Sequence, residues 1–337
     1  DCDERQSFRL RMESDITGNP GASRDCAVGG SRRRCASAGG SFSELNFSAF
    51  ISNGMSRIIA IANQKGGVGK TTTSVNLGAS LVKMQRRVLL VDLDPQANAT
   101  VGCGLTRAQY DHSTYSVLLG DCGAPEAIVQ TTSGIDLLPS EPALAGIQAE
   151  LTTETDRDIR LRAALSTITG YDYVLIDCPP SLNVLTINAL VAAHGVLIPV
   201  QCEYYALEGL SGLLETIARV RQSSNSGLAI EGLLRTMFDG RTSLSNEVSE
   251  QLQQHFGSKV FRTVVPRNVR LAEAPSHGKP VIDYDRSCIG TQAYLALAGE
   301  LVGPTRGDVH GNEAIHSADG ETTGSDRVAS PAGNAKW

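Results

Sequence analysis

Residues 63–72 read Asn-Gln-Lys-Gly-Gly-Val-Gly-Lys-Thr-Thr, a glycine-rich stretch that ends in Gly-Lys-Thr. The apolar run Ile58–Ala62 before it predicts a buried strand, and the residues that follow, Thr72–Met84, predict a helix. A strand, a glycine-rich turn and a helix start together predict a phosphate-binding loop, because glycines let successive backbone N–H groups face one anion. The helix start adds unpaired N–H groups and the positive end of its dipole.

The side chains of this loop suit a phosphate chain with its metal ion. Lys70 supplies a point charge for the β- and γ-phosphates, and the hydroxyl of Thr71 is a ligand for Mg²⁺. Contacts to the phosphates are expected from the loop and the first helical turn: Gly66, Gly67, Val68, Gly69, Lys70, Thr71 and Thr72.

A second lysine, Lys65, stands directly before the glycines, where an ordinary phosphate loop does not need one. The stretch Lys65–Thr72 resembles the deviant Walker A motif of the ParA/MinD family of partitioning ATPases. In that family the extra lysine reaches across an ATP-sandwiched dimer to the partner's nucleotide. The resemblance therefore implies ATP and Mg²⁺ as cofactors, an ATP-dependent homodimer, and a catalytic role in trans for Lys65 beside Lys70.

Apolar runs alternate with helical stretches from residue 57 to residue 301. The predicted strands are Ile58–Ala62, Val88–Val91, Ile135–Leu138, Tyr173–Ile176, Val196–Val200, Leu233–Met237 and Val260–Val265. The predicted helices are Thr72–Met84, Ala143–Leu151, Ile159–Ile168, Leu185–Ala193, Leu207–Arg221, Ser245–Phe256 with Ser245 as N-cap, and Ile289–Leu301. This alternation predicts an α/β fold, a mostly parallel twisted sheet flanked by helices on both faces, with ligands at the carboxyl ends of the strands.

Two carboxylates, Asp92 and Asp94, leave the end of the second predicted strand and enter a Pro-Gln turn. Beside a magnesium triphosphate, Asp94 is suited to orient or deprotonate the attacking water, and Asp92 to support Mg²⁺ through water. A polar turn that caps the next helix is the alternative. The stretch resembles the family's Asp-Pro-Gln-Gly-Asn switch sequence, with Ala97 in place of the glycine. We expect this alanine to be tolerated unless the position requires a positive φ.

Another predicted strand ends in Asp177 and Cys178 before a Pro-Pro turn. Asp177 is the Walker B candidate, which would hold Mg²⁺ through its water shell. Cys178 is expected to pack, because no basic partner for a catalytic thiol is evident.

Two later segments, residues 199–210 and 265–280, closely resemble chromosomal, Soj-like ParA proteins, and the resemblance extends over nearly all of residues 56–302. Family analogy places the purine near Pro266 and Asn268, whose amide can both donate to and accept from an adenine edge. His194 stands where the family usually carries an acidic residue, and we attach no function to it.

The net charge of −6 excludes a uniformly basic nucleic-acid binder, so contacts to DNA have to come from a local patch. Basic residues cluster in the last third of the fold, a region that contacts the DNA backbone without sequence preference in Soj-like proteins. The resemblance implies DNA-binding roles for Arg241, Arg267 and Arg270. Solvated or ion-paired arginines are the alternative for each of them.

The composition divides the chain into three regions. Residues 1–54 are rich in Gly, Ser and Arg, which predicts a disordered extension or a mis-called upstream region, with Met55 as the true start. Residues 55–302 are the predicted ATPase domain, and residues 303–337 a disordered tail. We find no apolar run near the roughly 20 residues of a membrane span and no signal segment, and we expect a cytoplasmic, nucleoid-associated protein.

The sequence therefore predicts an ATP hydrolase that segregates a chromosome or a plasmid. An ATP dimer would bind nonspecific DNA, and a ParB-like centromere-binding partner would stimulate its weak hydrolysis and release it. A MinD-like, membrane-associated division-site ATPase is the alternative. It needs a basic amphipathic helix at the C-terminus, whereas residues 303–337 carry more acidic than basic side chains. A metabolic enzyme on the same fold, such as a nitrogenase-like reductase or an amidoligase, is a further alternative.

Overall fold

A computed structural model describes residues 56–203, 206 and 208–303. The predictions made for residues 1–54 and for the tail after Gly303 lie outside the described residues. Within them, no helix is long and apolar enough to cross a membrane.

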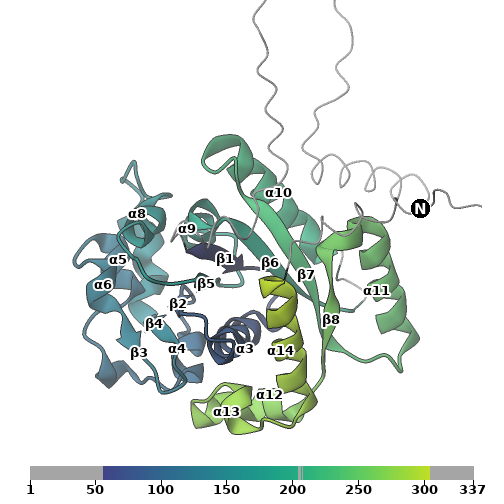
Figure 1. Ribbon diagram of the computed structural model, residues 1–337. Helices are drawn as coiled ribbons and strands as arrows, with labels where there is room; N and C mark the ends of the chain where they lie inside the picture. Colours follow the sequence, from purple (N-terminus) through teal and green to yellow (C-terminus); the bar gives the residue numbers. More distant parts are fainter. Residues whose placement is uncertain (1–55, 204–205, 207, 304–337) are drawn as a thin grey trace, which may run out of the picture. The chain divides into compact units, whose positions relative to one another are not determined.

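In the described part of the chain, eight strands form one sheet in the order β3-β4-β2-β5-β1-β6-β7-β8 (Figure 1). The strands are β1 (Arg57–Ile61), β2 (Val88–Asp92), β3 (Val129–Gln130), β4 (Asp136–Leu138), β5 (Tyr173–Asp177), β6 (Gly195–Gln201), β7 (Ala229–Phe238) and β8 (Val260–Pro266). Neighbouring strands are parallel, apart from the antiparallel pair of β3 and β4. The predicted fold class is confirmed, and the strand missed by the sequence is the two-residue β3 at the sheet edge.

Helices connect and cover these strands. They are α3 (Lys70–Lys83), α4 (Asn98–Gly102), α5 (Thr114–Leu119), α6 (Ala124–Ala127), α7 (Ile147–Glu150), α8 (Arg160–Leu165), α9 (Val184–Ala192), α10 (Glu208–Ser223), α11 (Ser243–Phe256), α12 (Val269–Glu273), α13 (Val281–Tyr284) and α14 (Ile289–Val302). Short 3₁₀ turns cover Arg107–Gln109, Pro142–Gly146, Gly257–Lys259 and Ala274–His277.

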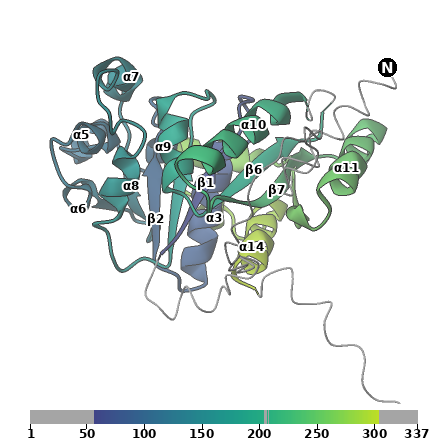
Figure 2. The ribbon, with the colours of Figure 1, turned by 90° about the horizontal axis from the view of Figure 1, so that it is seen from above.

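Side chains of each buried strand alternate between two hydrophobic cores, one on each face of the sheet. In β1, Ile59 and Ile61 belong to the core under α3, α4 and α12–α14, while Ala60 belongs to the core under α5–α11. Figure 1 shows α3 and α14 on one side of the sheet and α9 and α10 on the other. Seen from above in Figure 2, α11 lies beyond β7, at the opposite end of the sheet from α5, α6 and α7.

The predicted N-cap of α11 is wrong. The helix begins at Ser243 after Thr242, which places Ser245 inside the first turn. Ser245 is buried, and its hydroxyl donates to the carbonyl of Cys202 at 3.4 Å. The segment Thr242–Asn246 contains several residues suited to a cap, so the sequence alone leaves the exact start open.

Two glycines bring distant segments into backbone contact. A Cβ built on Gly104, after α4, would lie 2.7 Å from the carbonyl oxygen of Gly278, which follows the 3₁₀ turn at Ala274–His277. The converse Cβ on Gly278 would lie 2.7 Å from the Cα of Gly104. Both residues also have positive φ, so a side chain at either position would require the two segments to separate.

Candidate functional site

The phosphate loop connects β1, the fifth strand across the sheet, to α3. Gly67 and Gly69 have φ of 74° and 85°, a conformation that other residues adopt only with strain. Gly69 is the left-handed N-cap of α3, and Thr73 donates the first helical hydrogen bond to its carbonyl at 2.9 Å. The N–H groups of the first turn have no intrahelical acceptor, so they and the helix dipole are available to an anion.

Lys70 is the first residue of α3 and is almost fully buried beneath this loop. Its Nζ lies 3.3 Å from the carbonyl oxygen of Lys65, so the lysine closes the loop on itself. Burial lowers the pKa of Lys70, and the carboxylates of Asp177 and Asp94 act in the opposite direction. The structure thus places one buried ammonium between the loop and two carboxylates.

Asp177, at the end of β5, accepts hydrogen bonds from two of the hydroxyls at the start of α3. Its Oδ2 accepts from the Thr71 hydroxyl at 2.8 Å, and its Oδ1 accepts from the Ser74 hydroxyl at 2.7 Å. Burial raises the pKa of Asp177, and these two hydrogen bonds partly oppose the rise. Thr71 and Asp177, both predicted as magnesium ligands, are therefore brought together, which is the donor set of hydroxyl and carboxylate that Mg²⁺ prefers.

Asp92 is the neighbour of Asp177 across the β2–β5 ladder, and it is completely buried. Its Oδ1 accepts from the backbone N–H of Asp94, and its Oδ2 accepts from the N–H and hydroxyl of Thr100 at 2.8 and 2.7 Å. Burial, and then the charge of Asp177, raise the pKa of Asp92. Both oxygens of Asp92 are thus engaged in folding the turn that carries Asp94.

Asp94 is buried at the start of that turn. Its Oδ1 accepts from the N–H of Gln96 at 3.0 Å, and its carbonyl accepts from the Ser140 hydroxyl at 2.7 Å. Ala97, three residues on, has φ 54° and ψ 31°. The position therefore does adopt a positive φ, and the alanine is held there at a cost that a glycine would not incur.

Lys65 lies on the exposed side of the loop. Its backbone N–H donates to Asn63 Oδ1 at 3.0 Å, and its Nζ forms an ion pair with Glu203 Oε2 at 2.8 Å. Its side chain is 32% exposed, compared with the buried Lys70, so the two lysines of the loop occupy different environments.

The turn predicted to receive a purine lies at the end of β8. Pro266 is the last residue of β8 and is half-buried. Asn268 caps α12, with its Oδ1 accepting from the N–H of Arg270 at 2.8 Å. Because the cap engages the oxygen of the amide, the expected contact to a purine would have to come from the Nδ2 group as donor.

The three candidate DNA-binding arginines follow the carboxyl ends of β7 and β8, whose residues Phe238 and Pro266 are paired. Arg241 is 89% exposed and makes two hydrogen bonds, of 2.8 and 2.7 Å, to Asp239, which hold the pKa of that carboxyl at about 2. Arg267 is exposed and its charge also lowers the pKa of Asp239.

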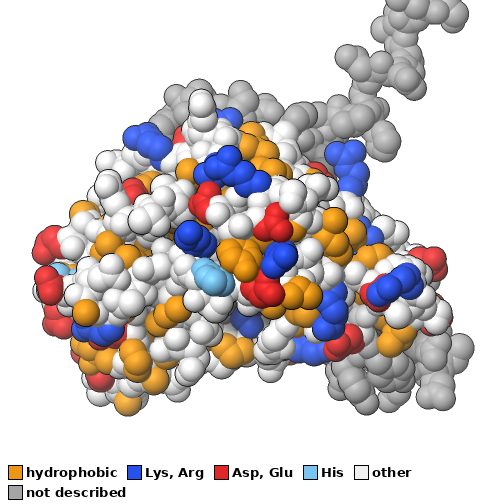
Figure 3. Space-filling model, turned by 90° about the horizontal axis from the view of Figure 1, so that it is seen from below, with side chains coloured by type: hydrophobic (Ala, Val, Ile, Leu, Met, Phe, Trp, Pro, Cys, Tyr) orange, Lys and Arg blue, Asp and Glu red, His pale blue; other side chains and the backbone are white. Residues whose placement is uncertain are grey.

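Arg270 forms ion pairs with Glu273 at 2.8 Å and with Asp285 at 3.4 Å. On the face that carries α12 and α13, seen in Figure 3, basic side chains alternate with acidic ones. The ion-paired alternative therefore describes Arg241 and Arg270 in the isolated chain.

Several residues of the site were missed by the sequence analysis, because tertiary contacts bring them there: Ser74, Thr100, Ser140, Glu203 and Thr236. Ser74 alone had a local signal, since it lies three residues after Thr71 and so shares its face of α3.

A glycine loop after a central strand, with a carboxylate of the neighbouring strand held against its threonine, defines the class of P-loop nucleotide hydrolases. The family model described as "AAA domain" matches residues 56–230. The chain is 52% identical over 254 residues to the chromosome partitioning protein ParA of Caulobacter vibrioides, covering 74% of this chain and 95% of that protein. It is 52% identical over 246 residues to the chromosome-partitioning ATPase Soj of Thermus thermophilus, covering 73% and 95%.

The chain belongs to the Soj/ParA family of chromosome-partitioning ATPases. Among solved structures, it is similar to cobyrinic acid a,c-diamide synthase from Mycobacterium smegmatis with bound ATP analog and magnesium (40% identity, TM-score 0.65, 74% of this chain and 95% of that chain). The septum site-determining protein MinD of Pyrococcus horikoshii, complexed with Mg-ADP, is more distant at 28% identity (TM-score 0.60, 73% and 96%). The partitioning prediction is confirmed at the level of the family, and the MinD-like alternative is disfavoured.

Proposed function

We propose that this chain binds and hydrolyses ATP with Mg²⁺ in order to segregate DNA. The observation that carries the proposal is the contact of Asp177 with Thr71 beside the buried Lys70. The phosphates would be held by the side chain of Lys70 and by the backbone N–H groups of residues 66–72, which form the loop and the first turn of α3. Thr71 and Asp177 would hold Mg²⁺, which supplies charge neutralisation on the β- and γ-phosphates.

Asp94 is the proposed residue that orients or deprotonates the attacking water, because it lies in the electrostatic field shared by Lys70 and Asp177. Asp92 supports this arrangement by holding the turn of Asp94. A direct role of Asp92 toward Mg²⁺ would require its oxygens to exchange their bonds to Asp94 and Thr100 for bonds to water. Pro266 and Asn268 are the proposed contacts to the purine.

Lys65 is proposed to act across a dimer. Its ammonium lies at the surface in an ion pair with Glu203, and exposed ion pairs of this kind contribute about 0–1 kcal/mol, so it exchanges partners at little cost. A second copy of the chain would receive it at the nucleotide. Two copies would also present two sets of Arg241, Arg267 and Arg270 to nonspecific DNA, which multiplies weak phosphate contacts into an adequate site.

A ParB-like centromere-binding protein is the proposed partner that stimulates weak hydrolysis and releases the DNA, at the nucleoid in the cytoplasm. The test is co-sedimentation of the protein with nonspecific DNA and with liposomes, each with ATP, ADP or no nucleotide. We expect ATP-dependent sedimentation with DNA only. Sedimentation with liposomes in ATP and none with DNA would replace the partitioning function by the MinD-like one.

Arginine variants test the DNA surface. Arg241→Glu and Arg270→Glu should weaken DNA binding and flatten its dependence on salt, since each phosphate contact contributes about 0.9 to the slope of log K against log salt. ATP binding and dimerisation should be unchanged, because both side chains lie at the surface in ion pairs outside the phosphate loop. Binding at the wild-type level by both variants would place the DNA on another surface.

A further inference from the structure

Thr236, near the end of β7, touches the phosphate loop although β6 separates β7 from β1 in the sheet. Its side chain is buried, at 2% exposure, and its hydroxyl donates to the carbonyl oxygen of Val68 at 2.8 Å. Its Cβ and methyl group lie 3.9 Å from the position that a Cβ of Gly69 would occupy. One side chain of β7 thus both bonds and packs against the loop at its left-handed glycine.

This contact fixes the peptide unit between Val68 and Gly69. In a planar trans peptide the C=O of one residue and the N–H of the next point in opposite directions. Holding the Val68 carbonyl toward β7 therefore turns the N–H of Gly69 away from β7. Because Gly69 is also the N-cap of α3, the same contact sets where the helix begins and where Lys70 stands.

The strand backbone becomes irregular directly after Thr236, while β7 continues to Phe238. Met237 has φ 48°, which is an outlier for a long side chain, and the pairing of β7 with β8 shifts register between Arg235 and Phe238. Strained backbone of this kind is found where the surrounding structure fixes a functional geometry.

Both ends of this short segment are anchored. Before it, the buried Arg235 donates to the Ser249 hydroxyl at 2.9 Å and to the Phe261 carbonyl at 2.8 Å, which ties β7 to α11 and β8. After it, Asp239 holds Arg241. Residues 236–240 therefore connect the carbonyl of Val68 in the phosphate loop to Arg241, a candidate DNA-binding arginine.

We propose that Thr236 is a positioning residue of the phosphate loop, and that through the irregular strand backbone at Met237 it links the nucleotide site to the loop of Arg241. The inference rests on the proposed function and adds to it the route by which the nucleotide acts on the DNA-binding surface. Thr236 does not act on the phosphates itself; it acts through Val68 and Gly69.

The first test removes only the hydroxyl. Thr236→Val keeps the shape of the side chain, and Thr236→Ser keeps the donor. We expect Thr236→Val to weaken the binding of ADP and ATP by about threefold to tenfold, the effect of one lost buried hydrogen bond, and Thr236→Ser to restore most of it.

Thr216→Val is the matched control, because Thr216 is equally buried and its hydroxyl donates to the backbone carbonyl of Gly212 within α10 at 2.9 Å. This variant should lower the melting temperature and leave nucleotide affinity unchanged. Equal nucleotide affinity in Thr236→Val and wild type, measured well below both melting temperatures, would overturn the positioning role.

The second test uses DNA at nucleotide concentrations that saturate every variant. The ratio of DNA affinity in ATP to that in ADP should fall in Thr236→Val and in Met237→Gly, because the segment no longer transmits the state of the loop. A wild-type ratio in both variants would overturn the link while leaving the proposed function standing. If wild type itself binds DNA equally in both nucleotides, the proposed function fails and the link fails with it.

Discussion

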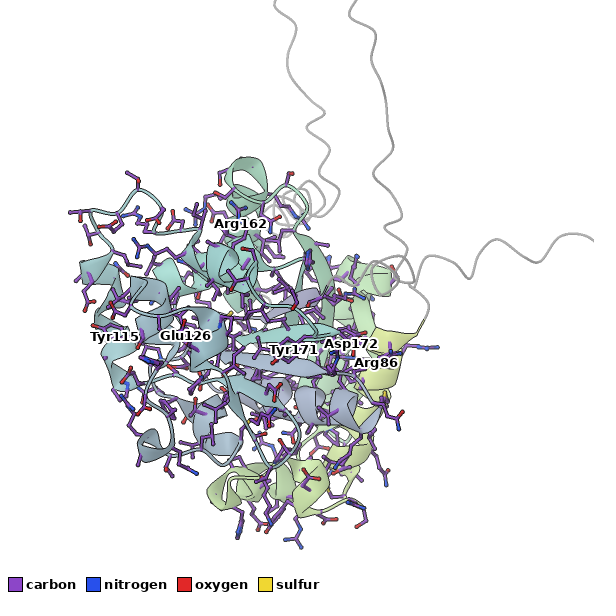
Figure 4. The ribbon with its side chains drawn as sticks, turned by 60° about the vertical axis from the view of Figure 1, so that its left-hand side comes forward. Arg86, Tyr115, Glu126, Arg162, Tyr171 and Asp172 are labelled. Carbon is purple, nitrogen blue, oxygen red and sulfur yellow. The ribbon has the colours of Figure 1, made fainter. Side chains whose placement is uncertain are left out.

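The amino ends and the carboxyl ends of the parallel strands, called here the amino edge and the carboxyl edge, differ in how their polar residues are arranged. At the amino edge, side chains pair with the strand ends that they border: Arg87 N–H with Asp172, Tyr171 hydroxyl with Asp136, and Arg57 with Glu231. Figure 4 shows Tyr171, Asp172 and Arg86 side by side at this end of the sheet.

At the carboxyl edge, Asp92 and Asp177 are buried with raised pKa values, and Ala97 and Met237 adopt positive φ. Hydrogen-bonded and oppositely charged partners satisfy polar groups at the amino edge, where Gln85 also has a positive φ of 59°, whereas the carboxyl edge holds two buried carboxylates on neighbouring strands. Backbone strain thus occurs at both edges, and the buried carboxylates distinguish the edge where the ligand is expected.

The largest effect is expected from removing the buried cation of the carboxyl edge. Lys70→Ala should abolish tight ATP binding and hydrolysis, because the phosphates lose their cation within the site. Lys65→Ala, the control within the same loop, should retain ATP binding and lose dimerisation and hydrolysis. Titration with a fluorescent ATP analogue and light scattering separate the two effects. If both variants lost ATP binding equally, the role of Lys65 in trans would be rejected.

Asp94→Ala should bind ATP and form the dimer but hydrolyse ATP at least about a hundredfold more slowly, since the water loses its orienting carboxylate. The trapped dimer should stay on DNA. Asp94→Asn keeps an oxygen for the N–H of Gln96 and so separates the fold of the turn from its chemistry. Normal turnover in Asp94→Asn would remove this carboxylate from the catalytic set.

Between the two edges, close packing limits the size of the side chains that the strands can carry. A Cβ on Gly232 of β7 would lie 2.5 Å from a ring carbon of Phe261 and 2.9 Å from the carbonyl oxygen of Lys259. Gly232→Ala should therefore lower the free energy of unfolding by about 1–3 kcal/mol in denaturant titrations. Gly227→Ala, where a Cβ meets only Asn225 at 3.8 Å, is the matched control and should be close to neutral. Equal stability of the two variants would contradict the packing argument.

The amino edge should be sensitive to acid through His194. Its Nδ1 accepts from the N–H of Ile58 at 3.0 Å, which requires the neutral ring, and burial, followed by the charge of Arg57, lowers its pKa from 6.5. Because the unfolded chain then binds the proton more readily than the folded one, stability is present above pH 6.5 and is lost as pH falls below it. As the pH falls below 6.5, the free energy of unfolding should decrease more in the wild type than in His194→Asn, which retains an acceptor for Ile58. Parallel pH curves for both proteins would exclude this role.

The smallest effect is expected at Ala97. Ala97→Gly should raise the free energy of unfolding by about 0.5–1 kcal/mol, because the relief of the left-handed strain exceeds the stability that is lost when the unfolded chain gains freedom. Ala99→Gly, in the regular helix α4, should be destabilising instead. A stabilising Ala97→Gly and a destabilising Ala99→Gly would locate the strain at Ala97. Changes of the same sign in the free energy of unfolding would contradict it.

The sequence predicted the carboxyl edge better than the amino edge. Lys70, Thr71 and Asp177, which the structure brings together, could be predicted because each follows a local pattern, a glycine loop or an apolar strand that ends in a carboxylate. The acceptor role of Asn268 in a helix cap, and the hydrogen bonds of Asp92 to Thr100, depend on how the backbone turns after the strand. No local motif in the sequence specifies those turns.

The amino edge was missed because its pairs join residues far apart in sequence. Arg57 and Glu231 are separated by 174 positions, and neither belongs to a motif. His194 was noted only as a departure from a family pattern, while its hydrogen bond to Ile58 exists only once β6 lies beside β1. Residues in local motifs can thus be predicted from the sequence, whereas contacts between distant strands become known only from the structure.

The contact of Gly104 with Gly278 limits how these segments can evolve. The segment after α4, downstream of Asp94, and the segment after α12, downstream of Asn268, meet backbone to backbone. A larger residue on one side has no compensating smaller residue on the other, since glycine is already the smallest. Relatives that share this contact should therefore keep both glycines or lose both together with a changed loop length, and a designer who grafts one segment has to carry the other with it.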